Sequence, residues 1–558
     1  MSETLKLMQH PDTERLTETT AQAVCLRANS RAVLEGAIAP IGDRYRIDLK
    51  TVDCQSGDTL ATAEAESADR NKVLGALAEA ANRLRQKLGE SLESVQKFKQ
   101  PLQEATTSSL EALQAYTQGR KKQAEQGEAA AVPYFKLAID LDPNFAYAYV
   151  ALGTSHYYLY EYSQAATNLK KAFDLRGQVS QRERFAIEGY YYDWVTGEMD
   201  KMGETHMEWA RTYPRDYIPH LRLNAYYRFI GQLEKAVSEG RQAVELSPDN
   251  AACAYALMIA YVRMNRFDDA TRVYEEARAR KLDSPILHAG RYVIAFLQRD
   301  GATMRDLLES AKGKPLTEDL QLAEHFRAEA HYGRMKQARE LSTAAADLAA
   351  KAGSPERAAQ WKTWEALAEA EIGNTERARR VAAEALALST GPDVSRQVAL
   401  VLALSGDFAQ AKKIADKLAH EHPLDTEIQY CSIPQVRAGV ALGLNKPNEA
   451  VDILTASIPY DLGDAFLIPA YLRGLAYLQA GKGRQAAGEF QKLLDHPGIL
   501  ESDLKGALAR LQLGRAQAMM GDKAAARKSY QDFLSLWKDA DPDIPIYKQA
   551  KVEYAKLG

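Results

Sequence analysis

Two stretches decide the fold of this chain: residues 231–250, GQLEKAVSEGRQAVELSPDN, and residues 265–280, NRFDDATRVYEEARAR. Each begins with Gly or Asn and carries an Ala five residues later, at the start of an Ala-rich amphipathic stretch. Gly and Asn tolerate the left-handed conformation that ends a helix, and a small Ala lets two helices approach closely. The pattern therefore predicts a helix, a tight turn and a second helix. It occurs at Gly231–Ala236, Asn265–Ala270, Gly333–Ala338, Gly373–Ala378, Gly406–Ala411, Asn445–Ala450, Gly481–Ala486 and Gly521–Ala526.

The helix pairs recur at a fixed spacing. Pro214 and Pro248 are 34 residues apart, and so are Tyr227 and Tyr261. Large residues, tyrosines and alanines follow one another in a fixed order within each period. This length and order resemble the tetratricopeptide repeat, a pair of helices about 34 residues long. Such repeats stack on their neighbours into a superhelix. We therefore expect a mostly α protein, a right-handed α-solenoid with a small N-terminal α+β module.

The chain divides into three parts. Residues 1–100 do not repeat, and their pattern predicts a small α+β module: a helix at 16–29, a three-stranded meander and a long helix from 71. A sheet this narrow is marginal alone, so we expect the module either to rest on the repeats or to lack a preceding strand. A connector at 98–107 leads to a solenoid at 108–543. At 34–40 residues a pair, this span predicts about 11–13 helix pairs. Residues 544–558 predict a capping helix.

Composition narrows the classes of function. The 558 residues carry a net charge of −4, with both signs mixed and no basic block, so a nucleic acid partner is not favoured. No apolar run is long enough to span a bilayer, so we expect no membrane insertion by this chain itself. The sequence contains no phosphate-binding loop, kinase catalytic loop, nucleophile elbow or zinc motif. We therefore expect no enzyme, no catalytic residue, no cofactor and no metal.

Aromatic residues crowd the early repeats and are the candidate binding residues. In tetratricopeptide arrays the first helix of each pair lines the concave groove, and aromatic rings with polar tips suit the recognition of a peptide. The alternative is that these tyrosines fill gaps between helices. The candidate groove residues are Tyr147, Val150, Thr154, Tyr157 and Tyr158 in one repeat and Tyr190 and Tyr191 in the next.

Several stretches resemble a narrower family. They are LGESL at 88–92, ATTSSLEAL at 105–113, YPRDY at 213–217 and FLSLWKDADPDIPIYKQAKVEYAKL at 533–557. Together they resemble the non-kinase C-terminal half of bacterial serine/threonine protein kinases that carry tetratricopeptide repeats. The resemblance implies a kinase domain and usually a membrane span before the small module, whose opening strand and helix would be missing here. No kinase catalytic residue can be carried over, because none of the matching stretches contains one.

The four cysteines leave two alternatives open. None forms a CxxC pair, and Cys253 and Cys431 lie in helical repeats as small buried residues. Cys25 and Cys54 lie in the small module, where reduced thiols are favoured on the residues alone and a disulfide requires an oxidising compartment. A complete chain would be cytoplasmic. A fragment of a membrane-anchored kinase would be extracytoplasmic, and the Cys25–Cys54 disulfide would then become plausible.

The repeats and the resemblance together predict two functions. The first is a protein–protein interaction scaffold or sensor module that binds a peptide or protein in its concave groove. The alternative is the regulatory or sensory half of a bacterial serine/threonine kinase whose catalytic domain is absent from this chain.

Overall fold

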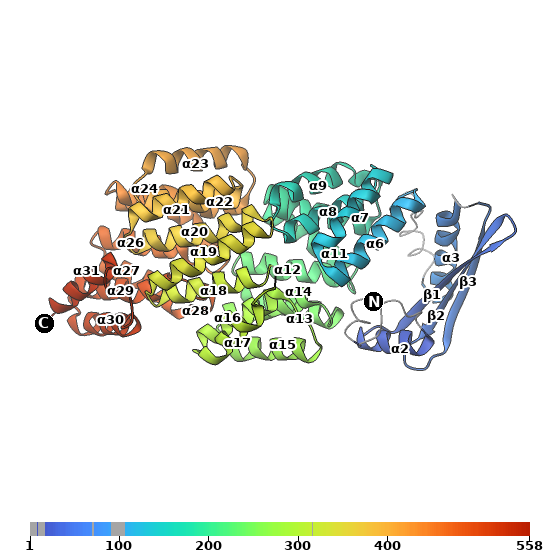
Figure 1. Cartoon of the computed structure of the whole chain (residues 1–558), viewed down its shortest axis with the longest axis horizontal. Helices are drawn as coiled ribbons and strands as arrows, with labels where there is room; N and C mark the ends of the chain where they lie inside the picture. Colours follow the sequence, from blue (N-terminus) through green and yellow to red (C-terminus); the bar gives the residue numbers. More distant parts are fainter. Residues whose placement is uncertain (1–7, 9–16, 70–71, 91–106, 315, 558) are drawn as a thin grey trace.

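The computed structural model describes residues 8, 17–69, 72–90, 107–314 and 316–557. The N-terminal module lies at one end of a long helical array (Figure 1). Its elements are α2 (Glu18–Arg27), β1 (Ala32–Ile41), β2 (Arg44–Asp53), β3 (Thr59–Ser67) and α3 (Val73–Lys87). The three strands form an antiparallel meander in the order β1-β2-β3. The expected connector at 98–107 and the expected start of the first helix at residue 16 fall outside the described residues, except for residue 107.

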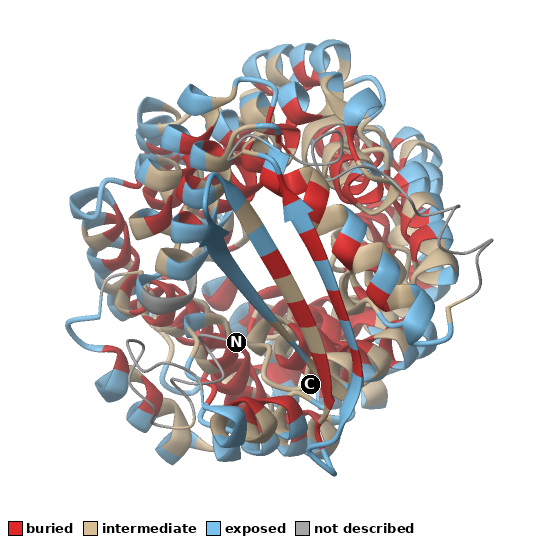
Figure 2. Cartoon of the chain, turned by 90° about the vertical axis from the view of Figure 1, so that its right-hand side faces the viewer, coloured by how far each residue is buried: buried red, intermediate tan, exposed pale blue. Residues whose placement is uncertain are grey.

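The core of the module lies between its sheet and α3. Alternate residues of β2 and β3 point at the helix, among them Ile47, Leu49 and Ala63, and they meet Ala80 and Leu84. Strand β1 is an edge strand, and seven of its ten residues are exposed and none is buried (Figure 2). The module therefore has a one-sided core that the sheet shares with a single long helix.

The module is held against the helical array through the end of α2. The guanidinium of Arg27 donates to Asp249 Oδ2 at 2.9 Å and to the carbonyl of Arg280 at 2.7 Å. Asn29 donates to the carbonyl of Glu245 at 3.4 Å. The module thus contacts the array at the ends of α13 and α15.

Residues 110–536 form twelve successive helix pairs within the described part of the chain. The first six pairs are α6 (Leu110–Gln126) with α7 (Glu128–Leu141), α8 (Ala146–Tyr158) with α9 (Tyr162–Asp174), α10 (Gln181–Tyr191) with α11 (Met199–Thr212), α12 (Tyr217–Phe229) with α13 (Leu233–Leu246), α14 (Ala251–Arg263) with α15 (Phe267–Ala279), and α16 (Pro285–Leu297) with α17 (Gly301–Ala311). The next six are α18 (Glu318–His331) with α19 (Met335–Lys351), α20 (Pro355–Glu371) with α21 (Thr375–Leu388), α22 (Pro392–Leu404) with α23 (Phe408–Glu421), α24 (Ile433–Gly443) with α25 (Pro447–Leu454), α26 (Ile468–Gln479) with α27 (Gly483–Asp495), and α29 (Lys505–Met519) with α30 (Lys523–Leu536).

Short elements join or extend some of these helices, and a last helix ends the array. They are η2 (Arg176–Gln178), η3 (Tyr192–Thr196), η4 (Ile428–Ser432), η5 (Thr455–Tyr460) and α28 (Pro497–Leu500). Helix α31 (Pro545–Ala555) buries Ile546, Tyr547 and Ala550 against the preceding pair.

The turn pattern read from the sequence is confirmed at every position. All eight Gly and Asn residues have a positive φ, from 57° at Asn445 to 93° at Gly373. The eight alanines that follow them are fully buried, with 0% of their surface exposed. Because Ala has the smallest side chain that still favours a helix, the two helices of a pair approach closely at this point.

The helical array closes on itself, which the repeat pattern alone did not show. Carbonyl groups at or just after the ends of four first helices accept hydrogen bonds from backbone amides far along the chain. These bonds join Thr426 N to Gly197 O (2.9 Å), Asp464 N to Phe229 O (3.3 Å), Asp541 N to Gly333 O (3.0 Å) and Ile546 N to Ile372 O (3.3 Å). The second superhelical turn therefore packs directly on the first.

Two glycines permit the closest approach of the two turns. A Cβ added at Gly463 would lie 1.8 Å from the carbonyl oxygen of Phe229, and one at Gly498 would lie 1.8 Å from that of Val262. Both obstacles are backbone atoms, which cannot rotate aside as a side chain would. Asn265 completes the second contact, because its Oδ1 accepts from Gly498 N at 2.9 Å.

We predict that Gly498→Ala destabilises the protein and loosens the contact between the two turns. Relieving the clash requires a backbone shift, at a cost on the order of 1–3 kcal/mol. Gly488→Ala is the matched control, because a Cβ there meets nothing within 4 Å and Ala is favoured over Gly inside a helix. Urea unfolding and hydrogen exchange at 258–266 would measure the effect. Equal stability of the two variants would contradict it.

Candidate functional site

The first helices of the pairs line the interior of the superhelix. A cavity of about 390 Å³ opens there between residues 228–263 of the first turn and residues 464–504 of the second. Its remaining walls come from α18, α20, α22, η4 and the start of α24. Because these segments meet only through the closure of the array, the cavity is a product of the tertiary fold.

Ion pairs dominate the wall of this cavity. Arg263 pairs with Asp464 and lies over the ring of Phe466, with its guanidinium carbon 4.9 Å from the ring centroid. Arg327 Nη1 pairs with Glu324 at 3.2 Å and with Glu501 at 3.0 Å. The Arg263–Asp464 and Arg327–Glu501 pairs join the two turns, since Asp464 and Glu501 belong to the second turn.

Two further groups of charges lie on the same wall or directly behind it. Arg396 pairs with Glu427 at 2.8 Å and with Asp393 at 3.0 Å. Lys505, whose side chain is only 2% exposed, pairs with Glu371 at 2.7 Å and with Asp503 at 3.3 Å. Each of these cations therefore has two carboxylates.

Arg228 differs from the other cavity arginines because no carboxylate pairs with it among the described residues. Its Nε donates to Asn224 Oδ1 at 3.1 Å, which leaves its two terminal amino groups facing the cavity. Burial and the nearby charge of Arg263 lower the pKa of Arg228. The pKa of Asp464 is lowered against the effect of its own burial, because Arg263 and Arg228 are both close to it.

Three carboxyl groups of the cavity wall have strongly raised pKa values. Burial raises the pKa of Glu324, Glu371 and Glu427 to about 7 in each case, and their cationic partners offset only part of that effect. A buried carboxylate is poorly solvated, so it takes up a proton more readily than one in water. These three groups therefore keep a proton up to a higher pH than an exposed Glu does.

The early aromatic residues form a second feature of the interior, a cluster around Trp194. Tyr157 stacks on Trp194 with ring centroids 3.7 Å apart, and Tyr190 lies 4.8 Å from the same ring. Tyr158 approaches it edge-on at 6.0 Å and remains 49% exposed. The guanidinium carbon of Arg222 lies 4.5 Å from the centroid of Trp194, within the range of a cation–π contact.

Three of the seven candidate groove residues, Tyr157, Tyr158 and Tyr190, thus have ring contacts with Trp194, whereas Val150 and Tyr147 belong to the core that Trp194 and Tyr190 pack against. Val150 and Thr154 were expected on the groove, but they are only 4% and 8% exposed. Helix α8 is covered on several sides, and Val150 packs in a core cluster with residues of α9 and α10. Tyr147 is half-buried beside Tyr116, and Tyr191 stacks on Phe173 at 3.7 Å, outside the Trp194 cluster.

The Trp194 cluster lies close to the charged cavity without lining it. Asp193 adjoins Arg222 in the cluster, with 3.6 Å between their charged atoms. Burial raises the pKa of Asp193, and Asp464 of the cavity wall is close enough to raise it further. The cavity could not be predicted from the sequence, since isolated Arg and Glu residues on helices normally indicate a solvated face.

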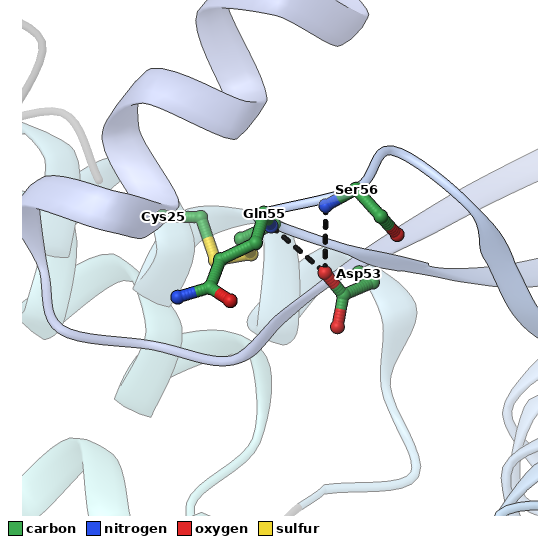
Figure 3. Close-up of a disulfide and its surroundings, with 5 residues drawn as sticks. Cys25, Asp53, Gln55 and Ser56 are labelled. Atoms are coloured by element: carbon green, nitrogen blue, oxygen red, sulfur yellow. Dashed lines mark hydrogen bonds between the residues drawn. A yellow bond between two sulfur atoms is a disulfide. The ribbon is translucent and has the colours of Figure 1, made fainter.

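The structure joins Cys25 of α2 to Cys54, the residue after β2, by a disulfide (Figure 3). The Cα atoms of the two residues are 6.0 Å apart. The turn beyond Cys54 is shaped by Asp53, whose Oδ1 accepts from the amides of Gln55 at 2.8 Å and Ser56 at 2.9 Å. The bond therefore fixes the first helix of the module to the end of its central strand.

Two other kinds of feature are missing from the described residues. No group of three or more His, Cys, Asp and Glu side chains in the described part of the chain is placed to hold a metal ion. Among the described helices, none combines the length and the apolar character needed to cross a membrane.

Comparison with known proteins identifies the repeat. The family model described as "Tetratricopeptide repeat" matches residues 231–291, which include the turns at Gly231 and Asn265 and the helices that follow them. The helices within this range belong to tetratricopeptide repeats. The array that they build is an α-solenoid preceded by a small three-stranded module. No curated protein sequence matches the chain.

Two solved structures are similar to parts of the chain. One is MamA 41-end from Desulfovibrio magneticus RS-1, at 18% identity and a TM-score of 0.23, covering 32% of this chain and 99% of that one. The other is yeast Tom70, at 12% identity and a TM-score of 0.28, covering 80% of this chain and 95% of that one. Neither similarity contributes to the functional interpretation, because both TM-scores are low.

We predict that Glu324→Gln gains stability relative to the wild type as the pH rises. The folded protein binds the Glu324 proton more tightly than the unfolded chain, since the pKa is about 7 rather than the ordinary 4.5. The wild type therefore loses stability between these pH values, by roughly 3 kcal/mol in all, whereas Gln has no proton to lose. Arg327, Glu501, Tyr255 and Tyr292 are the charged or titratable neighbours of this carboxyl.

Urea unfolding of both proteins at about pH 5 and about pH 8 would test this linkage. Glu309→Gln, at a side chain that is 68% exposed, controls for the substitution itself. A stability difference between Glu324→Gln and the wild type that stays constant with pH would show that the prediction is wrong.

Proposed function

We propose that this protein is an interaction scaffold or sensor arm that binds a protein or peptide segment along the inner wall of its superhelix. The observation that carries the proposal is the Trp194 cluster, in which Tyr158 remains 49% exposed beside a cation–π pair. Trp, Tyr and Arg are the residue types that contribute most to the affinity of protein interfaces. Their partial exposure on first helices, the helices that line the cavity, supports this interpretation.

The chemistry of the cluster favours an extended peptide over other partners. Flat rings with polar tips contact apolar side chains and also accept hydrogen bonds from a backbone. Charges of both signs are mixed along the chain, so we propose no nucleic acid partner. We also assign no catalytic role to any residue.

We predict that Tyr158→Ala weakens peptide binding by about 5–30-fold, the effect of losing a contact worth 1–2 kcal/mol. A random peptide library selected on the wild-type protein would supply the ligands, and fluorescence anisotropy would measure each affinity. Tyr430→Ala is the matched control, because Tyr430 is 50% exposed and lies outside the cluster. Failure to enrich any peptide, or equal losses in both variants, would contradict the proposal.

A second candidate function is the extracytoplasmic sensory half of a membrane-anchored serine/threonine kinase. The disulfide between Cys25 and Cys54 favours it, because disulfides form and persist in oxidising compartments. In this arrangement the repeats would bind a signal outside the cytoplasm, and the small module would lie between them and the membrane.

We predict that Cys25 and Cys54 of the protein from its native source resist alkylation until a reductant is added. Reduction should destabilise the module by about 3–4 kcal/mol, since the bond closes a loop of 29 residues. Cys253 and Cys431 should react only after unfolding, because both are buried. Mass spectrometry of alkylated peptides would provide the measurement. Alkylation of Cys25 and Cys54 without reductant would contradict this second candidate.

A further inference from the structure

The charges around the interior cavity are distributed unevenly. Three groups have one cation for two carboxylates: Arg327 with Glu324 and Glu501, Arg396 with Asp393 and Glu427, and Lys505 with Glu371 and Asp503. The fourth group reverses this ratio, because Arg228 and Arg263 both lie close to Asp464. Glu501, which pairs with Arg327, acts on both of them less strongly. The wall thus has one region with an excess of positive charge and three with an excess of negative charge.

The positive region and one of the negative regions lie next to each other. Tyr255 lines the cavity with both groups, and its hydroxyl is close enough to Arg228 and Arg263 of one group and to Glu324 and Glu501 of the other to be influenced by each. A ligand at Tyr255 would therefore meet a guanidinium with free amino groups and a pair of carboxylates at once.

The cavity has the size and the access that a small ligand needs. Its volume of about 390 Å³ falls within the range of ligand pockets, roughly 300–1,000 Å³. Trp364, Leu367 and Leu500 supply apolar wall beside the charges. Solvent reaches the charged groups, because the side chains of Asp464 and Glu427 are still 30% and 33% exposed.

We propose that this cavity binds a small zwitterion, whose carboxylate pairs with Arg228 and whose ammonium group pairs with Glu324 and Glu501. Guanidinium groups bind carboxylates through two parallel hydrogen bonds, and Arg228 has both terminal amino groups available for this. Glu324 and Glu501 share one cation, Arg327, and the ammonium group would supply a second one. A free amino acid carries both groups on one residue, and a short peptide carries one at each end. The site is separate from the Trp194 cluster, so the inference does not depend on peptide binding there.

Isothermal titration calorimetry of the full chain with free amino acids and with di- and tripeptides would test this proposal. Two chemically blocked forms of each ligand serve as controls: the N-acetyl form, which lacks the ammonium group, and the amide, which lacks the carboxylate. We expect at least one zwitterion to bind and both of its blocked forms to bind about tenfold more weakly or worse. Binding by free amino acids points to a metabolite, and binding by peptides alone points to a peptide terminus.

Substitutions locate the binding in the cavity. Arg228→Gln should weaken binding of the zwitterion by about tenfold or more. Arg228→Lys should weaken it less, because Lys keeps the charge but cannot form two parallel hydrogen bonds with a carboxylate. Arg380→Gln, at a side chain that is 64% exposed, should change nothing. Tyr158→Ala should also leave this affinity unchanged, which separates the result from the test of the scaffold. Circular dichroism would confirm that each variant is folded.

Three outcomes would overturn the proposal. They are the absence of binding by any amino acid or short peptide, equal binding of blocked and free forms, and unchanged affinity in folded Arg228→Gln.

Discussion

The left-handed turn between the two helices of each repeat is the constraint on which the whole structure depends. At Gly231 or Gly333 the backbone adopts a positive φ that costs Gly little, and the next helix leaves at once with a buried Ala against its partner. The same short turns bring the carbonyl groups at the ends of the first helices to the surface of the first superhelical turn. Those groups then accept hydrogen bonds from the second turn, as Phe229 and Gly333 do.

Closure of the array explains why so many charges are buried in a protein of this type. An open solenoid leaves its concave face in water, where Arg and Glu residues are easily solvated. Here Arg263 and Arg327 cross from the first turn to Asp464 and Glu501 of the second, so each charge that loses water gains a partner. Arg228 lacks such a carboxylate partner within the described residues, and it faces the cavity. Ion pairs therefore hold the interior together. Of the cavity arginines that the structure describes, the one without such a partner, Arg228, lies where we propose that a ligand binds.

The sequence predicted the local unit well and the long-range arrangement poorly. The spacing of Gly231 and Ala236 depends on backbone sterics within a few residues, so the turn could be identified directly. The contact between Gly498 and Val262 joins residues in different superhelical turns, and it depends on small rotations accumulated over several repeats. The position of Val150 within its repeat predicted that it lies on the groove. Its burial depends on the neighbouring helices, however, and residues of α9 and α10 cover it. Arg228 could not be identified as a binding residue from the sequence, because it lines a cavity only when the helical array closes.

Native-state hydrogen exchange at single-residue resolution tests the closed superhelix most directly. The amides of Thr426, Asp464, Asp541 and Ile546 donate to carbonyl groups of the preceding turn. If the array is closed, these four amides exchange slowly, like those of the helices around them. If they exchange as fast as amides in unstructured chain while the neighbouring helices stay protected, the two turns do not pack together and the cavity does not form.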